Sequence, residues 1–312
     1  MNDSIGEHAV AVGGEMIITR PLDRARAISG LISEEALASE RLGRLTDKVA
    51  AALLDANLLS ILVPRADGGL GGTGVELFEA AEEIARADGS AGWCVAISNA
   101  VSGFVHKGIA AKARMEVFGH GPVACWATLL PKASSVEEKG GFRVSGNFGW
   151  GSGSSVSRWV MVPARLADRD GQQWFRAHLL PKDDADIKEG SWDVMGLRGT
   201  ASIDYSITDK FVPAHRAFEY PFLADANPQN ASAQGLIQRG QPGIAAFASG
   251  IGFRALAELI AAAPKTKRLL AEGTQADDNV VQFGIGEFEG RLRAARAHYL
   301  GLVAQQDAAI AR

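Results

Sequence analysis

The chain is organised around two segments, and the first carries residue types suited to holding a planar ligand. The first, residues 140–159 (GGFRVSGNFGWGSGSSVSRW), places Trp150 in a loop rich in glycine and serine. Glycine lets the backbone approach a ligand closely, serine supplies short hydroxyl groups, and tryptophan offers a flat apolar face. The second, residues 192–216 (WDVMGLRGTASIDYSITDKFVPAHR), contains Arg198 and Thr200. A polar hairpin with one stray tryptophan fits the same residue types, so both interpretations stand at this point.

The periodicity of residues 122–218 places both segments in a β-rich region. Short runs here are rich in strand-forming residues and are separated by glycine, aspartate or proline-lysine turns. These runs are residues 123–128, 142–147, 159–164, 174–180 and 203–211. Prolines fall at or beyond the ends of the runs, where a missing N–H group does least harm to a sheet. We therefore predict a middle domain built as a small antiparallel β-barrel or sandwich.

A helical region, residues 21–121, precedes this domain and follows a loosely held arm at residues 1–20. Thr46 is predicted to cap one helix, because its side chain can accept a hydrogen bond from a free backbone N–H group. Residues 75–87 place apolar side chains on one face, which is typical of an amphipathic helix. A second helix of small side chains follows. The N-terminal domain is therefore expected to be helical.

The glycines of DGGLGGTG, residues 67–74, have the spacing of a dinucleotide-binding fingerprint. Gly69, Gly71 and Gly74 match it, and Asp88 lies at roughly the right distance beyond them. Such a site needs a strand directly before the glycines and a second parallel strand after the helix. Here a proline-containing stretch separates the preceding apolar run from the glycines, and another helix follows. We interpret the glycines as a tight connector between helices.

The C-terminal part is predicted to be a linker, residues 219–240, followed by a helical bundle, residues 241–312. One helix spans residues 243–263 and ends at Pro264. The final helix has a repeating apolar stripe made of Val281, Ile285, Phe288, Leu292, Ala295, Tyr299 and Leu302. This spacing predicts the seam of an antiparallel bundle or of a contact between subunits. Because the seam lacks a full partner within the chain, we expect a truncated bundle and a homo-oligomer, either a dimer or a tetramer.

The composition of the 312-residue chain is that of an ordinary soluble globular protein, with 47% hydrophobic and 22% charged residues. Its net charge of −4 argues against nucleic acid or an anionic membrane as the main partner. No apolar run is long enough to predict a membrane span and the N-terminus lacks a secretory signal, so we expect a cytoplasmic protein. Cys94 and Cys125 have neither disulfide-type nor metal-type spacing, and no metal site is predicted.

The chain has a helical N-terminal region, a β-rich middle region and a helical C-terminal region, and in this order it resembles the acyl-CoA dehydrogenase superfamily. Within it, the chain is most similar to the two-component flavin-dependent monooxygenases, which hydroxylate aromatic or related substrates. The front segments SERLGRLTDKVAAALLDANLLSILVPRADGGLGG and EIARADGSAGW are typical of that branch. WATLLP at residues 126–131 and FGWGSG at residues 148–153 match the two flavin segments of the family, and residues 196–213 match the strand pair that closes the β domain.

The resemblance implies a flavin, FMN or FAD, that lies against the β domain and is supplied in reduced form by a separate flavin reductase. Trp150 would pack on the isoalloxazine ring, and Ser152 would hydrogen-bond its polar edge. The cofactor-binding residues implied in this way are Trp126, Thr128, Leu129, Ser135, Trp150, Gly151 and Ser152. Arg198 and Thr200 would lie near the substrate, although Arg198 fits equally well as a structural ion-pair partner. The implied activity is hydroxylation of an aromatic or related small organic substrate with O2.

Departures from the family pattern bear on the chemistry. An acyl-CoA dehydrogenase needs a carboxylate base, yet residues 241–257 contain no acidic residue, and Leu130 replaces a glutamate of the family pattern. The monooxygenases usually place a histidine a few residues after a Gly-Trp pair, which is Gly92-Trp93 here. In this chain Asn99 and Ser102 follow the pair, and His106 lies about one helical turn beyond the usual position. We therefore assign no catalytic residue. An acyl-CoA dehydrogenase or oxidase, and a truncated relative without catalytic activity, are the alternatives.

Overall fold

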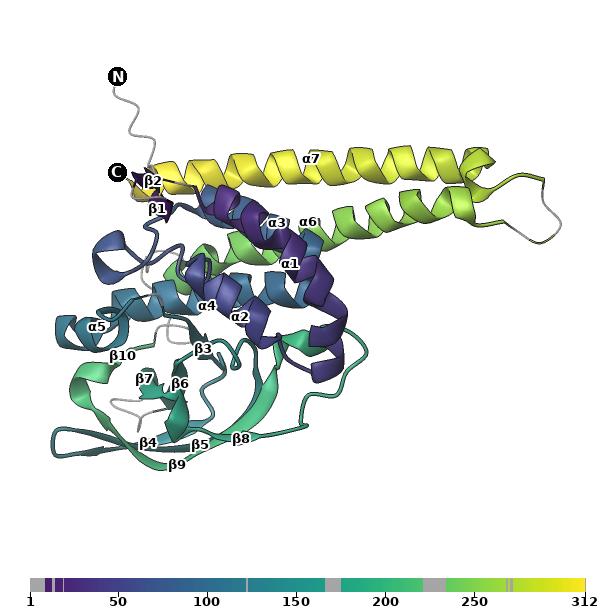
Figure 1. Cartoon of the computed structure of the whole chain (residues 1–312). Coiled ribbons are helices and arrows are strands. Elements are labelled where there is room, and N and C mark those ends of the chain that lie inside the picture. Colours follow the sequence, from purple (N-terminus) through teal and green to yellow (C-terminus); the bar gives the residue numbers. More distant parts are fainter. Residues whose placement is uncertain are drawn as a thin grey trace, which may run out of the picture.

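A computed structural model describes residues 9–12, 15–18, 20–121, 123–165, 175–220, 234–267, 269 and 272–311. A group of helices lies against one side of a curved sheet, and two long helices extend from this body side by side (Figure 1). In the predicted arm, β1 (Ala9–Val12) and β2 (Glu15–Ile18) form an antiparallel pair. Most of the predicted linker lies outside the described residues.

The N-terminal region contains five helices, α1 (Pro21–Leu42), α2 (Asp47–Asp55), α3 (Gly74–Ala87), α4 (Gly89–Gly108) and α5 (Ala111–Phe118). Side chains cap the N-termini of three of them, α2, α3 and α4. The predicted cap at Thr46 is confirmed, since its side chain accepts a hydrogen bond from the backbone N–H of Val49. The amphipathic helix is confirmed as α3, which Thr73 and Glu76 open with a reciprocal capping box.

The glycine-rich stretch is a connector, as predicted. A short 3₁₀ helix (Arg65–Asp67) precedes it, and α4 follows α3 without an intervening strand. The first backbone amides of α3, at Gly74 and Val75, lie 2.9 and 3.0 Å from the two carboxylate oxygens of Asp307. These are the amides that a phosphate would need at a helix N-terminus, so a carboxylate of the chain itself occupies that position.

The sheet of the middle region is mixed rather than purely antiparallel. Its strands are β3 (Cys125–Ala127), β4 (Ala133–Glu138), β5 (Gly141–Gly151), β6 (Trp159–Arg165), β7 (Phe175–Pro181), β8 (Asp186–Lys188), β9 (Ile203–Pro213) and β10 (Ala217–Glu219). They are ordered β10-β7-β6-β4-β5-β9-β8, with β3 also beside β6. Both β3 and β4 run parallel to β6.

This arrangement corrects the expectation that the sheet is antiparallel throughout, and it does not confirm a barrel or sandwich. The next strand after β5 in the sequence is β6, and it does not pair with β5. It pairs with the other side of β4 and runs in the same direction as β4. The two outer strands of the order, β10 and β8, are not paired with each other among the described residues, so the sheet is not closed. What remains of the expectation is a central sheet between two helical regions.

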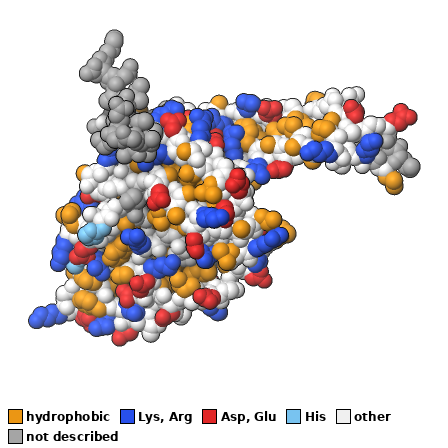
Figure 2. Space-filling view, in the orientation of Figure 1, with side chains coloured by type: hydrophobic (Ala, Val, Ile, Leu, Met, Phe, Trp, Pro, Cys, Tyr) orange, Lys and Arg blue, Asp and Glu red, His pale blue; other side chains and the backbone are white. Residues whose placement is uncertain are grey.

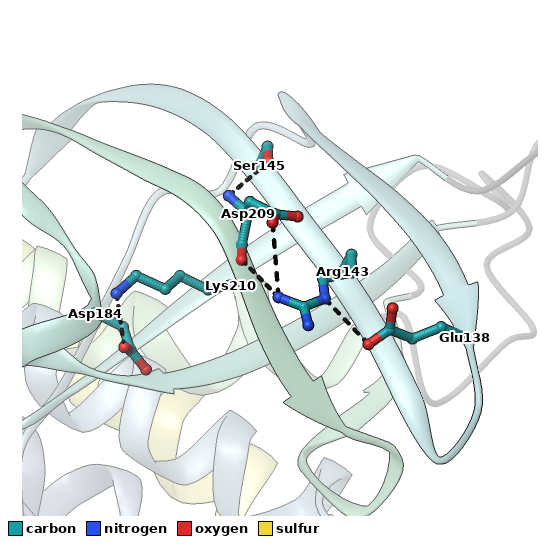
Figure 3. Close-up of polar contacts among 6 residues, drawn as sticks. All are labelled: Glu138, Arg143, Ser145, Asp184, Asp209 and Lys210. Atoms are coloured by element: carbon teal, nitrogen blue, oxygen red, sulfur yellow. Dashed lines mark hydrogen bonds and ion pairs between the residues drawn. The ribbon is translucent and has the colours of Figure 1, made fainter.

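Exposed polar groups link neighbouring strands on the outer surface of the sheet (Figure 3). Arg143 on β5 donates to a carboxylate oxygen of Glu138 at 3.1 Å and to the backbone carbonyl of Asp209 at 3.0 Å. Ser145, at a register shift between β5 and β9, accepts a hydrogen bond from the backbone N–H of Asp209 at 2.9 Å. Exposed ion pairs of this kind add little stability, and here they connect β4, β5 and β9.

The two long helices are α6 (Gln234–Ala262) and α7 (Asn279–Ile310). α6 begins earlier than the predicted helix and takes up the last residues of the predicted linker, with Pro242 inside it. Proline removes one helical hydrogen bond, but close packing on both sides of it holds the helix together. A Cβ atom on Gly240 would lie 2.8 Å from Ala100 of α4, and one on Gly243 would lie 2.9 Å from Ala96.

By length and composition alone, one described helix is apolar enough to cross a membrane, over Gly240–Lys265. The core helix of a soluble protein passes the same test. The inner half of this segment packs on α3 and α4, where a Cβ atom on Gly250 would lie 2.6 Å from Ala85. The expected absence of a membrane partner therefore stays a prediction.

A buried carboxylate ties α7 to the body of the protein. Glu82 of α3, only 4% exposed at its side chain, lies 2.8 Å from Nε of Arg296 on α7. It also accepts a hydrogen bond from the hydroxyl of Ser249 on α6 at 2.5 Å, and it lies 3.5 Å from a guanidinium nitrogen of Arg86. Helices α3, α6 and α7 thus meet at one charged group.

Candidate active site

Three elements meet where residues 140–159 and residues 192–216 come together, and we call this place the corner. They are the end of β5 with the loop at residues 152–158, the 3₁₀ turn η3 (Arg198–Thr200), and α4. Trp150 stands at the edge of this corner with 74% of the residue exposed. Its backbone has φ of 60°, which is uncommon for a bulky residue and marks a conformation that its surroundings impose.

Trp126 supports the strand that carries Trp150. It is completely buried, and a Cβ atom on Gly151 would lie 2.3 Å from its ring, so only glycine fits at that position. The Trp126 ring meets Tyr205 edge-on, with centroids 4.3 Å apart, and Tyr205 stacks on Phe148 at 4.9 Å. These rings form a rigid base beneath the corner.

Thr128 lies over the same aromatic base. Tyr205 donates its hydroxyl proton to Thr128 Oγ1 at 3.1 Å, and Thr128 donates to the carbonyl of Gly149 at 3.0 Å. Burial raises the pKa of the Tyr205 hydroxyl, so it remains a donor at any ordinary pH. Leu129 is 40% exposed, and its backbone carbonyl accepts a hydrogen bond from the Tyr220 hydroxyl at 2.8 Å.

A chain of hydroxyl groups joins the loop to η3. Ser152 Oγ lies 2.7 Å from Ser202 Oγ, which lies 2.7 Å from Thr200 Oγ1. Thr200 donates to the carbonyl of Leu197 at 2.8 Å. Ser152 and Thr200, predicted at the site from the sequence, are therefore brought together, and Ser202 between them is a residue that the sequence reasoning missed. Its position two residues after Thr200 was the only available signal.

The turn η3 is held in a strained conformation. Leu197 before it and Ala201 after it have φ of 61° and 46°, in the left-handed region that side chains with a Cβ atom avoid. Each such residue costs on the order of 1–3 kcal/mol, which the surrounding contacts must offset. A Cβ atom on Gly199 would lie 2.9 Å from Ser90 of α4, so the turn is pressed against that helix.

Buried hydroxyl groups without partners border the same corner. Ser98 of α4 is 1% exposed, and its Oγ has no hydrogen-bond partner among the described residues. It lies 3.6 Å from the point that a Cβ atom on Gly153 would occupy. The Oγ of Ser155 in the loop is likewise buried and unpartnered. Buried polar groups are normally satisfied, so these two hydroxyls are exceptions to the usual pattern.

The side chains of Arg198 and Ser135 have hydrogen-bond partners outside this hydroxyl chain. Arg198 donates through its backbone N–H to a carboxylate oxygen of Glu40 on α1, and its side chain pairs with Asp193. Its observed contacts are those of a structural ion-pair partner, and contact with a substrate stays a prediction. Ser135 on β4 shares a hydrogen bond of 3.0 Å with Nε2 of His178 on β7.

The residues that follow the Gly-Trp pair on α4 have structural partners. The side-chain amide of Asn99 donates to the carbonyls of Leu58 and Val95 and is fully buried. Ser102 accepts a hydrogen bond from the backbone N–H of Cys125 at 3.0 Å. His106 lies 2.7 Å from a carboxylate oxygen of Asp67 in the connector before α3. Among the described residues, none of the three is hydrogen-bonded to Trp150, Ser152, Thr200 or Ser202, and no catalytic base is assigned there.

Comparison with known proteins gives one consistent result. A family model described as the acyl-CoA dehydrogenase N-terminal domain matches residues 28–113, and one described as the acyl-CoA dehydrogenase C-terminal domain matches residues 242–312. The oxygenase subunit HsaA of a flavin-dependent monooxygenase from Mycobacterium tuberculosis is 30% identical over 299 residues, covering 90% of this chain and 73% of the relative. A pigment production hydroxylase from Rhodococcus erythropolis is 29% identical over 88% of this chain and 72% of its own length.

Solved structures agree with this result. The 3-HSA hydroxylase from Rhodococcus sp. RHA1 superposes with a TM-score of 0.80 at 26% identity, covering 93% of this chain and 76% of that chain. XiaF from Streptomyces sp., solved in complex with FADH2 and glycerol, has a TM-score of 0.82 at 23% identity, covering 93% of this chain and 75% of that chain. At that level of identity, the likeness to XiaF shows the fold alone.

Proposed function

Because this chain belongs to the acyl-CoA dehydrogenase family, and within it to the flavin-dependent monooxygenases, we propose that it is the oxygenase component of a two-component system. It would use reduced FMN or FAD from a separate reductase, together with O2, to hydroxylate a small aromatic or related organic substrate. The observation that carries the proposal is the exposed Trp150, which lies two residues before the half-buried Ser152 in the loop that follows β5.

The residues of the corner fit a flavin. Trp150 offers one flat apolar face, Gly151 brings the backbone close, and Ser98 and Ser155 hold hydroxyl groups that lack partners within the described part of the chain. When bound, a reduced flavin would supply two electrons, so that one oxygen atom of O2 enters the product and the other leaves as water. The chain itself would bind and orient the ring and hold a substrate next to it.

The names of other relatives support an aromatic substrate. They include an FADH2-dependent resorcinol hydroxylase from Rhizobium sp. at 30% identity and an indole-3-acetate monooxygenase from Pseudomonas putida at 29% identity. Resorcinol is a phenol and indole-3-acetate carries an indole ring, and both rings are electron-rich. We propose a phenol or an indole as the class of substrate for this chain.

The test of this function starts with anaerobic gel filtration of the protein with photoreduced FMN or FAD. The reduced flavin should elute with the protein. When O2 is then admitted, reoxidation of the flavin should follow a time course different from that of free reduced flavin, because the protein controls access to the ring. Reduced flavin that elutes separately would contradict the proposal and favour the non-catalytic alternative.

Replacing Trp150 with alanine should weaken flavin binding. Aromatic contact with the ring should contribute about 0.5–1.5 kcal/mol beyond the area buried, so we expect a several-fold rise in Kd. Phe211→Ala is the matched control, because Phe211 is an exposed aromatic residue on β9 that lies outside the corner. Equal Kd values for wild type and Trp150→Ala, with intact circular dichroism, would remove Trp150 from the site.

Acyl-CoA thioesters should not bleach the flavin of the oxidised holoprotein. Dehydrogenation needs a carboxylate to take the α-proton, and residues 241–257 of α6 contain none. The measurement is the flavin absorbance during titration with acyl-CoA esters of several chain lengths. Rapid bleaching by any of them would establish the dehydrogenase or oxidase alternative instead.

We also propose a homo-oligomer, either a dimer or a tetramer, assembled through α6 and α7. Both helices expose large apolar side chains where they extend from the body, among them Phe283 at 72% and Phe288 at 54% (Figure 2). Phe288→Asp should therefore shift the protein to smaller species in light scattering, because a charge opposes burial of this surface. Val136→Asp, at an exposed position of β4, is the control. A monomeric wild-type protein at micromolar concentration would contradict this proposal.

A further inference from the structure

The backbone carbonyl of Leu197 is the acceptor around which the turn η3 is built. It accepts hydrogen bonds from the indole Nε1 of Trp192 at 3.0 Å, from the hydroxyl of Thr200 at 2.8 Å and from the backbone N–H of Thr200 at 3.1 Å. Leu197 meets these donors with left-handed backbone angles, φ of 61° and ψ of 29°. Ordinary angles would turn the carbonyl away, so the place of Thr200 in the corner depends on a conformation that leucine avoids.

The side chain of Leu197 is held between two helices. A Cβ atom on Gly89, the first residue of α4, would lie 3.5 Å from Cδ2 of Leu197 and 3.2 Å from Cδ1 of Ile251 on α6. Both side chains therefore lie over the same glycine, and we call this contact the clamp. The apolar contact in the clamp opposes the strain at Leu197.

The contacts of α6 fix the position of Ile251. Two residues before it, the hydroxyl of Ser249 donates to the buried carboxylate of Glu82 on α3 at 2.5 Å. A Cβ atom on Gly250 would lie 2.6 Å from Ala85, so α6 is pressed against α3 at the residue next to Ile251. The isoleucine half of the clamp is thus set by the packing of α6 on α3.

A cavity beside the clamp gives the Leu197 side chain a second place to lie. The cavity holds about 390 Å³, and Leu197, Gly89 and Ile251 form part of its wall together with Ala36 and Ala255. A leucine released from the clamp has room to enter it. A strained turn, a contact that holds it and free space next to it are what an element with two arrangements requires.

We propose that Leu197 and Ile251 are positioning residues of the candidate site. The clamp holds η3 in its strained form, and without the clamp the turn relaxes and carries the Thr200 hydroxyl out of the corner. The position of α6 therefore decides whether this part of the corner is formed. Neither side chain needs to contact a ligand for this role.

Hydrogen exchange followed by mass spectrometry tests the clamp without any ligand. The peptide to follow spans residues 198–203, in which the amides of Thr200 and Ala201 bond within the turn. Leu197→Ala removes the clamp but keeps the strain, so exchange of this peptide should become about tenfold faster. Leu197→Gly removes clamp and strain together, because glycine adopts left-handed angles without a steric cost, so its exchange should stay close to that of wild type.

Loss of packing alone predicts the opposite order for these two variants. Glycine removes more contacts than alanine and adds freedom to the open chain, so Leu197→Gly would then exchange faster than Leu197→Ala. Exchange that is faster in Leu197→Gly than in Leu197→Ala, or equal in both variants and wild type, would overturn the inference.

Ile251→Ala extends the test to α6. It should speed exchange of the same peptide in the wild-type background and change it little in the Leu197→Gly background, where no strain at Leu197 is left to oppose. Ile260→Ala is the matched control, since it changes the same residue type in the same helix at 45% exposure, compared with 38% for Ile251. If Leu197→Ala does not fold, the effect of Ile251→Ala in the two backgrounds decides.

Reduced FMN connects the clamp to the site, and this comparison rests on the proposed function. At ten times its Kd, a flavin that binds only to the formed corner should slow exchange of the wild-type peptide by about tenfold. Flavin that binds without slowing exchange would overturn the positioning role. If no flavin binds to wild type, the proposed function fails, and the order of exchange among the variants still decides whether the clamp holds η3.

Discussion

Replacing Glu82 with alanine should lower the free energy of unfolding by about 1–3 kcal/mol, because the change leaves two partly exposed arginines and one hydroxyl without their acceptor. The carboxylate is 4% exposed and lies 2.8 Å from Nε of Arg296. Without it, Arg296 and Arg86 would face each other with no negative charge between them, and the hydroxyl of Ser249 would lose its acceptor. Chemical denaturation followed by circular dichroism measures this difference.

A matched control for Glu82 lies on α7. Glu289 pairs with Arg293 at 2.6 Å, but their side chains are 37% and 70% exposed. Glu289→Ala should change the unfolding free energy by less than about 0.5 kcal/mol, since exposed helical pairs contribute little. If Glu82→Ala costs no more than Glu289→Ala, the buried carboxylate does not hold α3, α6 and α7 together.

The protein should lose stability when the pH falls from 7 to 5, because His178 is buried without charge. Burial lowers the pKa of His178 from its ordinary value of 6.5 to about 4. The unfolded chain therefore binds a proton between pH 6.5 and pH 4 that the folded protein does not. Stability from this group is complete above pH 6.5 and declines as the pH falls, by about 2 kcal/mol between pH 7 and pH 5.

The measurement is the unfolding free energy of wild type and His178→Leu at both pH values. The variant lacks the titrating group, so its loss of stability over the same interval should be smaller by about 2 kcal/mol. His298→Gln, at an exposed position of α7, is the control and should follow the wild type. An identical pH dependence in wild type and His178→Leu would show that His178 is not the group responsible.

Local sequence signals predicted the elements of the fold well. The cap at Thr46, the amphipathic helix that became α3, and the strand around Trp159 all follow from residues close together in the chain. The direction of β3 and β4 relative to β6 could not be predicted in this way. It depends on which strands β6 lies beside after the loop that follows β5. Those pairings join residues that are distant in the sequence.

The same distinction applies to the candidate site. The sequence indicated Trp150 and Ser152 because glycine, serine and tryptophan cluster in a single loop. Ser202 forms its hydrogen bond with Ser152 across fifty positions of the chain, and Asp307 reaches the amide of Gly74 from α7, so no local pattern marks either contact. The burial of Trp126 beneath Gly151 also depends on how two strands lie together.

The measurement that tests the central claim most directly is the origin of the oxygen in the product. The protein, a flavin reductase, NADH and a panel of phenols and indoles are incubated under ¹⁸O₂, and the products are analysed by mass spectrometry. If the chain is a flavin-dependent oxygenase, a hydroxylated product will carry one labelled oxygen atom and will require both proteins. Hydroxylated product that carries no label, or reduced flavin consumed entirely to hydrogen peroxide with every compound, would contradict it.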